Sequence, residues 1–149
     1  MALLKQLQAD SLTVQVFSDR DSMGAQAAAD AAACLRKLLS EKDEVNMIFA
    51  AAPSQNETLA HLVREKDIDW TRVNAFHMDE YIGLPEGAPQ SFGKYLTDHI
   101  FALVPFRSVH RIDYQAKDAA LEAERYSALL REYPTDIVCL GIGENGNDS

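Results

Sequence analysis

Val45-Asn-Met-Ile-Phe-Ala-Ala-Ala52 is an almost unbroken apolar run of strand length, and Pro53 ends it. Such a run is typical of a strand that is buried on both faces, as strands in parallel sheets are. The residues that follow, Ser54-Gln-Asn-Glu57, fit a capping box, which predicts that a helix begins there. A buried strand that leads directly into a helix is the unit from which parallel sheets are built.

Units of the same kind lie on either side of this stretch. Short apolar and β-branched runs predict further strands over residues 12–17, 73–76 and 136–140. Helices are expected after the capping residues Ser18, Asp19 and Ser91, and over residues 119–133. This alternation favours an α/β fold with a parallel sheet and helices on both faces.

The helix after Asp19 is predicted to bury one face, formed by Ala27, Ala31, Cys34, Leu35 and Leu38. The other cysteine, Cys139, lies far along the chain, and the pair has no metal-ligand spacing. We therefore expect two buried thiols in a reducing cytosol.

The chain has 149 residues, with 14 Lys and Arg against 23 Asp and Glu, and a formal net charge of −9. This length suits a single α/β domain over residues 1–149. The acidic balance argues against nucleic acid or an anionic membrane as a partner, but not against a small phosphate ligand, which backbone N–H groups bind locally. No stretch resembles a membrane span or a signal peptide, which predicts a cytoplasmic protein.

A glycine turn, Gly141-Ile-Gly-Glu-Asn-Gly146, follows the last predicted strand, close to the end of the chain. A βαβ arrangement would continue beyond this turn, so we expect the strand to lie inside a larger sheet and the chain to be the N-terminal part of a domain. The turn matches G-x-G-x-x-G, but it follows the last predicted strand rather than the first, where a dinucleotide motif is expected. Close backbone approach to a substrate is therefore favoured over a dinucleotide site.

Ligands of parallel sheets bind beyond the carboxyl ends of the strands. Residues 52–56, 79–84 and 141–146 are expected to converge there. In the first segment, Ser54 and free backbone N–H groups near a helix start suit a phosphate. The alternative is that Ser54 only caps the helix, with Glu57 as its partner.

The second segment places Asp79 and Glu80 directly after a predicted strand. Adjacent carboxylates in a partly buried cleft raise one another's pKa, which suits a general base near neutral pH. The alternative is a solvated acidic turn with Tyr81 packed on the core. His77 fits a structural role as well as a catalytic one, and the histidines lack the spacing of a metal site. Asp79 and residues 53–56 are expected to open into a shared hollow.

Three motifs in this order resemble the glucosamine-6-phosphate deaminase (isomerase) family, whose relatives include the 6-phosphogluconolactonases. They are Ile48–Glu57, Phe76–Pro85 followed by Gln90-Ser-Phe92, and Leu140–Gly146. The Met-Asp-Glu-Tyr-Ile-Gly-Leu-Pro segment at 78–85 is the most specific of them. The resemblance covers only the N-terminal part of the family domain. It implies a Rossmann-like α/β fold and a reaction that needs neither metal nor cofactor.

The resemblance further implies that a hexosamine phosphate, glucosamine 6-phosphate, opens, isomerises from aldose to ketose and loses ammonia. Asp79 would move the proton between C1 and C2, with Asn145 also in the catalytic site. The substrate-binding residues would be Ser54, Gln55, Glu80, Tyr81, Gly143 and Gly146.

The sequence departs from the family pattern at the phosphate loop, which reads Ala52-Pro-Ser-Gln55 where Gly and Thr are common. Asn147-Asp-Ser149 replaces a segment with a histidine that assists ring opening, and the later basic residues that would neutralise the phosphate are absent. A 6-phosphogluconolactonase-like hydrolase and a non-catalytic sugar-phosphate-binding fragment therefore stay open as alternatives. Self-association into a homo-oligomer through an exposed strand edge is a further expectation.

Overall fold

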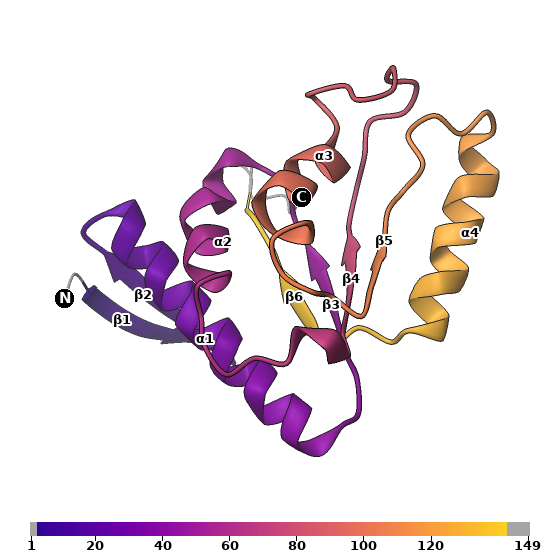
Figure 1. Cartoon of the computed structure of the whole chain (residues 1–149). Coiled ribbons are helices and arrows are strands. Elements are labelled where there is room, and N and C mark those ends of the chain that lie inside the picture. The colour runs from indigo at the N-terminus through magenta and orange to yellow at the C-terminus, as the bar shows by residue number, and fades with distance from the viewer. Residues whose placement is uncertain (1–2, 143–149) are drawn as a thin grey trace.

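A parallel four-stranded sheet forms the centre of the computed structural model, which describes residues 3–142 (Figure 1). In spatial order the strands are β5 (Ser108–His110), β4 (Val73–His77), β3 (Val45–Phe49) and β6 (Ile137–Cys139). β3 pairs in parallel with both β4 and β6, and β4 pairs with β5. The predicted α/β fold is confirmed, and the apolar run at 45–49 lies inside the sheet, as its composition requires.

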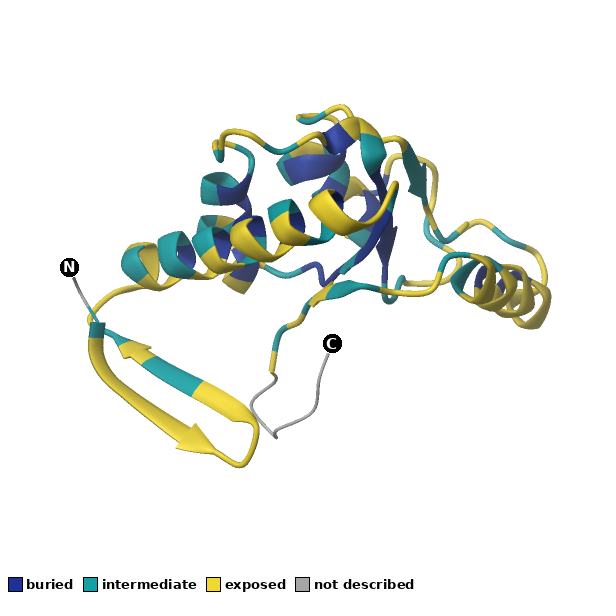
Figure 2. Ribbon diagram, turned by 90° about the horizontal axis from the view of Figure 1, so that it is seen from below, coloured by how far each residue is buried: buried dark blue, intermediate teal, exposed yellow. Residues whose placement is uncertain are grey.

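Helices cover both faces of the sheet (Figure 2). On one face lie α1 (Arg20–Glu41), α2 (Asn56–Leu62), α3 (Phe92–Leu96) and a π-helical turn, η3 (Thr97–Phe101). The core between these helices and the sheet contains alternate residues of β3 and β4, among them Met47, Phe49 and Ala75. α4 (Ala119–Glu132) lies on the other face, where the Tyr126 and Phe76 ring centroids are 6.1 Å apart.

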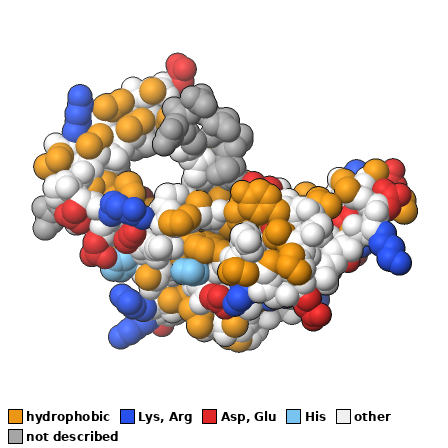
Figure 3. Space-filling view, turned by 90° about the horizontal axis from the view of Figure 1, so that it is seen from above, with side chains coloured by type: hydrophobic (Ala, Val, Ile, Leu, Met, Phe, Trp, Pro, Cys, Tyr) orange, Lys and Arg blue, Asp and Glu red, His pale blue; other side chains and the backbone are white. Residues whose placement is uncertain are grey.

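The strand expected over residues 12–17 forms, but it is not part of the parallel sheet. It is β2 (Leu12–Phe17), which pairs antiparallel with β1 (Leu3–Ala9) in a separate hairpin. Residues 3–9 supply a local antiparallel partner, and Asp10 at φ 53° adopts a turn conformation that aspartate tolerates. The hairpin stands apart from the sheet (Figure 2). Hydrophobic side chains are exposed on it (Figure 3), among them Leu7, Leu12 and Val16.

The buried face of α1 differs from the predicted one. The buried residues are Gly24, Ala28, Ala32, Leu35 and Leu39. Of the predicted face, Leu35 is buried, Ala31 and Leu38 pack against the core while only partly buried, and Cys34 is exposed. The expectation that Cys34 is a buried thiol was therefore wrong. Alanines lie on several sides of α1, so its apolar pattern does not determine which side faces the core. Burial raises the pKa of the Cys139 thiol, in β6, to about 11.

The predicted capping box at residues 54–57 is also absent. Pro53–Gln55 form a 3₁₀ turn, η1, and α2 begins only at Asn56, without a side-chain cap. Proline at the start of this turn has the fixed φ that a tight helical turn needs. Glu57 instead pairs with Arg20 from the start of α1, at 2.8 Å.

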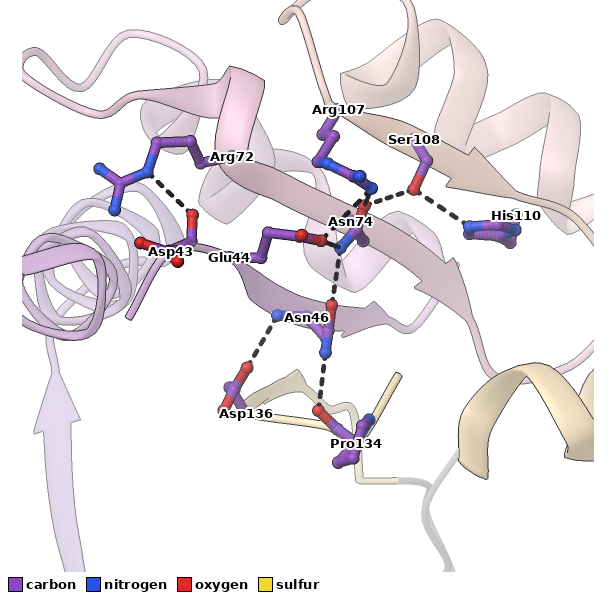
Figure 4. A network of polar contacts seen from close by, with 10 residues as sticks. All are labelled: Asp43, Glu44, Asn46, Arg72, Asn74, Arg107, Ser108, His110, Pro134 and Asp136. Atoms are coloured by element: carbon purple, nitrogen blue, oxygen red, sulfur yellow. Dashed lines mark hydrogen bonds and ion pairs between the residues drawn. The ribbon is translucent and has the colours of Figure 1, made fainter. Parts of the chain in front are cut away.

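A network of polar side chains joins the strands at the amino edge of the sheet (Figure 4). The Asn74 amide, fully buried in β4, donates to Asn46 of β3 at 2.9 Å and to Glu44 at 2.8 Å. Its oxygen accepts from Ser108 at the start of β5. Asn46 in turn donates to the carbonyl of Pro134, ahead of β6, at 2.9 Å. These contacts satisfy the buried amides and fix the relative positions of the strands.

β6 lies at one edge of the described sheet, with β3 as its neighbour. The expectation that a further strand lies beyond it stays a prediction. β5, at the opposite edge, was not predicted, because its short stretch of Ser108, Val109 and His110 has no apolar run. Within residues 3–142, none of the helices has the length and apolar character needed to cross a lipid bilayer.

Candidate functional site

The carboxyl ends of β3, β4 and β6 meet at one edge of the sheet, because these strands are parallel and adjacent. The chain segments that leave them therefore emerge side by side, which is where parallel sheets bind ligands. Gly143, Asn145 and Gly146, expected in the third of these segments, lie outside the described residues.

Asp79, two residues beyond β4, lines a cavity of about 420 Å³ between its loop and α4. Much of the wall is apolar, with Ile82, Ile112 and Tyr126 among the lining residues. The Asp79 carboxylate is only half-buried, so it remains accessible from this cavity. A carboxylate on a largely apolar wall is suited to removing a proton from a bound ligand.

The two adjacent acids differ in protonation behaviour. Burial, with a smaller contribution from the neighbouring Glu80 charge, raises the pKa of Asp79. Burial also acts to raise the pKa of Glu80, but hydrogen bonds from Gly93, Ser91 and other donors outweigh it and lower that pKa. The expectation that both acids raise one another's pKa is thus correct only for Asp79. Of the two acids, Asp79 therefore has the greater affinity for a proton, and the hydrogen bonds to Glu80 favour its ionised form.

Glu80 holds the start of α3. One carboxylate oxygen, Oε1, accepts from the backbone N–H groups of Tyr81 at 3.0 Å and Phe92 at 2.8 Å. The other, Oε2, accepts from the Ser91 hydroxyl at 2.7 Å and the Gly93 N–H at 2.9 Å. Ser91 also caps α3, as the sequence predicted, by accepting from the Lys94 N–H. Glu80 therefore attaches the Asp79 loop to the helix, while Tyr81 is exposed and packs on the Phe92 ring.

Replacing Glu80 by Gln is expected to lower the free energy of unfolding by about 2 kcal/mol, because an amide nitrogen would face N–H donors and leave them unpaired. The lowered pKa of Glu80 means that its contribution is present above pH 4.5 and is lost as the pH falls through the folded-state value. Urea unfolding at pH 7 and at pH 3 measures both effects, with Glu86→Gln in the exposed part of the same loop as control. Equal loss in both variants would contradict the assignment.

His77 fixes the backbone of the Asp79 loop from inside the protein. Its Nε2 accepts from the Ile112 N–H at 2.9 Å, so the ring proton lies on Nδ1, which donates to the Asp79 carbonyl oxygen at 3.0 Å. Burial, the dominant influence, lowers the pKa of the His77 ring and favours this neutral form. The Tyr126 hydroxyl of α4 accepts from the backbone N–H of His77 and donates to the backbone carbonyl of His110.

Ser54 and Gln55 lie in the η1 turn after β3 and line a different cavity, of about 690 Å³, between α1, α2 and β6. Ser54 is exposed and Gln55 is buried. Because the Ser54 hydroxyl does not cap α2, it is available to a ligand. The guanidinium of Arg20 donates to the Pro53 carbonyl at 2.9 Å, which brings a cation to this turn.

The two loops are connected through α3. The Tyr95 hydroxyl lies 2.7 Å from both the Ala52 carbonyl and the Asn56 side-chain oxygen, while Glu80 holds the other end of the helix. Burial raises the pKa of Tyr95 to about 12, so its hydroxyl remains a donor. The described residues do not join the two cavities, and the shared hollow for Asp79 and residues 53–56 stays a prediction.

Sequence reasoning did not identify Arg20, Tyr95 or Tyr126 as contributors to this edge. Their contacts join residues far apart in the chain, and none of them belongs to a recognisable motif. Over the part of the chain that the structure describes, no three His, Cys, Asp or Glu side chains gather in a way that would hold a metal ion.

Comparisons with a family model and with curated sequences point to the same protein family. A family model described as glucosamine-6-phosphate isomerases/6-phosphogluconolactonase matches residues 18–147. The glucosamine-6-phosphate deaminases of Streptococcus sanguinis and Listeria welshimeri are 35% and 38% identical over 113 and 104 residues. These alignments include 74% and 70% of this chain but 48% and 44% of those proteins, so the chain spans about half the length of the curated relatives it matches.

Solved structures show the same fold. A monomeric glucosamine-6-phosphate deaminase superposes with a TM-score of 0.77 at 25% identity, over 87% of this chain and 55% of that one. The 6-phosphogluconolactonase from Plasmodium vivax superposes with a TM-score of 0.82 at 14% identity, over 97% of this chain and 52% of that one. The second likeness concerns the fold alone.

Proposed function

Because this chain belongs to the family of glucosamine-6-phosphate isomerases and 6-phosphogluconolactonases, we propose that the full-length protein converts glucosamine 6-phosphate and water into fructose 6-phosphate and ammonia. The family contains two chemistries, amine loss and lactone hydrolysis. The curated relatives with 35% and 38% identity carry the name of the deaminase, which supports the first.

The observation that carries this proposal is the difference between Asp79 and Glu80. Both acids line the cavity, but Asp79 has a raised pKa, whereas both oxygens of the Glu80 carboxylate accept hydrogen bonds from the start of α3. An aldose–ketose isomerisation needs one group that removes a proton from C2 and returns it to C1. A carboxylate with a raised pKa is the stronger base of the pair and serves in both directions. Water then replaces the amine at C2.

The η1 turn is proposed to bind the phosphate of the same substrate. Ser54 offers its hydroxyl, and Arg20, which also pairs with Glu57, brings a cation to the same turn. The N–H groups of Gln55 and Asn56 donate to carbonyls within the turn, so they are not counted as phosphate ligands. Gln55 and Tyr81 are proposed as further substrate contacts, and Asn145, Gly143 and Gly146 as contributions from the third segment. Glu80 positions the loop in this scheme.

The test is an assay of the purified full-length protein with glucosamine 6-phosphate, in which ammonia and fructose 6-phosphate are both measured. Equal amounts of the two products are expected. A parallel assay with 6-phosphogluconolactone measures acid release, and hydrolysis there without ammonia formation would replace the deaminase by the lactonase. Calorimetric binding of glucosamine 6-phosphate without turnover in either assay would select a non-catalytic binding protein.

Ser54→Ala is expected to raise KM for glucosamine 6-phosphate about tenfold, with little change in kcat, because one hydrogen bond to a charged phosphate is worth about 1.5–3 kcal/mol. Steady-state kinetics measure the effect. Ser11→Ala, in the exposed turn of the hairpin, removes the same hydroxyl outside both cavities and is expected to leave KM unchanged. An unchanged KM in Ser54→Ala would remove this residue from the phosphate site.

A further inference from the structure

We propose that His77 is a positioning residue for Asp79, acting through the hydrogen bond from its Nδ1 to the Asp79 backbone carbonyl. The imidazole is buried and is not among the residues that line the Asp79 cavity, so it is assigned a positioning role and not a role in proton transfer. Its role rests on the proposed function of Asp79 as the base, and it explains how a loop residue is held at a fixed place beyond the sheet.

The geometry gives His77 this role because both ring nitrogens are used. Nε2 accepts from the Ile112 N–H at 2.9 Å, on the segment that follows β5, and this fixes the ring and its tautomer. Nδ1–H then has one partner, the Asp79 carbonyl at 3.0 Å. His77 is only 1% exposed, so both contacts are shielded from bulk solvent.

The surroundings hold the ring without reaching Asp79 themselves. The His77 ring packs edge-on against Phe101 of η3 and Tyr126 of α4, with centroids 6.4 Å and 6.1 Å away. The Tyr126 hydroxyl accepts from the backbone N–H of His77, which anchors the end of β4. Among these contacts, the Nδ1 hydrogen bond is the one that extends from the core to the backbone of the catalytic loop.

Two substitutions separate this role from a purely structural one. In His77→Asn, the side-chain amide occupies the place of Nδ1, so it can still donate to the Asp79 carbonyl, but it loses Ile112. In His77→Gln, the longer amide reaches the place of Nε2, so it can accept from Ile112, but it no longer donates to Asp79. Glutamine fills more of the imidazole's volume, so it should leave the more stable protein.

Positioning and packing therefore predict opposite orders of activity. If His77 positions Asp79, kcat for glucosamine 6-phosphate falls about tenfold in His77→Gln, with KM little changed, and His77→Asn recovers most of it despite its lower melting temperature. If His77 only fills space, His77→Asn has the lower kcat, in parallel with its lower stability. A lower kcat in His77→Asn than in His77→Gln, or equal kcat values in the two variants, would overturn the proposal.

The titration of the Asp79 carboxyl, followed by ¹³C NMR in the full-length protein, is a readout that does not depend on turnover. Loss of the Nδ1 contact should release the loop toward solvent and move the Asp79 pKa down toward its ordinary value in His77→Gln, but not in His77→Asn. If the wild-type protein converts no glucosamine 6-phosphate, the proposed function fails, and this titration still decides the role of His77. An Asp79 pKa that is the same in all three proteins would overturn it.

Discussion

Asp79→Asn is expected to lower kcat for glucosamine 6-phosphate by about 10²–10⁴-fold, the usual contribution of a positioned general base. Asparagine has nearly the same shape but cannot accept the proton from C2. Because His77 and Glu80 hold the loop through backbone contacts, the substitution should not displace it. KM should therefore change little, since the proposed phosphate site lies in the η1 turn, outside the cavity of Asp79. Turnover within threefold of wild type would exclude Asp79 as the base.

The raised pKa of Asp79 gives this variant a second, independent signature. A carboxyl that binds its proton more tightly in the folded state destabilises the fold when it ionises, as the pH rises from the unfolded value toward the folded one. Asp79→Asn should therefore raise the melting temperature at pH 7, and the gain should disappear below pH 3.8, where wild-type Asp79 is neutral in both states. Asp43→Asn removes the same charge at an exposed site outside both cavities and serves as the control.

The central strand of the fold could be predicted from the sequence, because a strand that is buried on both faces consists mainly of apolar residues. Residues 45–49 are apolar with one exception, and only a strand with neighbours on both sides needs such a run. The hairpin was not predicted because its first strand, residues 3–9, contains a lysine and two glutamines and is mostly exposed. The same limit applies to α1, where alanines on every side allow several faces and only packing against α2 selects one.

The candidate site also has features that the sequence predicts and features that it does not. That Asp79 and Ser54 emerge at one edge follows from the alternation of strands and helices, since parallel neighbours end together. What each acid does there depends on donors 11 to 13 residues away, on Ser91, Phe92 and Gly93, and no periodicity records those contacts. The polar partners of His77 are likewise a backbone carbonyl and a backbone N–H, which have no sequence signature.

Gly24→Ala is expected to lower the free energy of unfolding by about 3 kcal/mol, the upper part of the range for overpacked interiors. Gly24 lies where α1 crosses α2, and a Cβ there would stand 2.6 Å from the Glu57 Cβ and 2.8 Å from both the Glu57 carbonyl carbon and the Thr58 nitrogen. Two of these atoms are backbone, so they cannot move without displacing α2. The expected loss exceeds the gain in helix propensity, which is about 1 kcal/mol for this exchange.

The two contributions to the stability of Gly24→Ala have opposite signs. Helix propensity alone would stabilise the variant, so a loss of stability can only come from the overlap between α1 and α2. Urea unfolding measures it, with Ala33→Gly on the exposed side of α1 as control, where a loss of about 1 kcal/mol reflects propensity without packing. Because α2 follows directly on the η1 turn, its displacement should also raise KM for glucosamine 6-phosphate in Gly24→Ala and not in the control. A more stable Gly24→Ala protein would mean that α1 and α2 are not in this close contact, and the η1 turn would then lose the support that places Ser54.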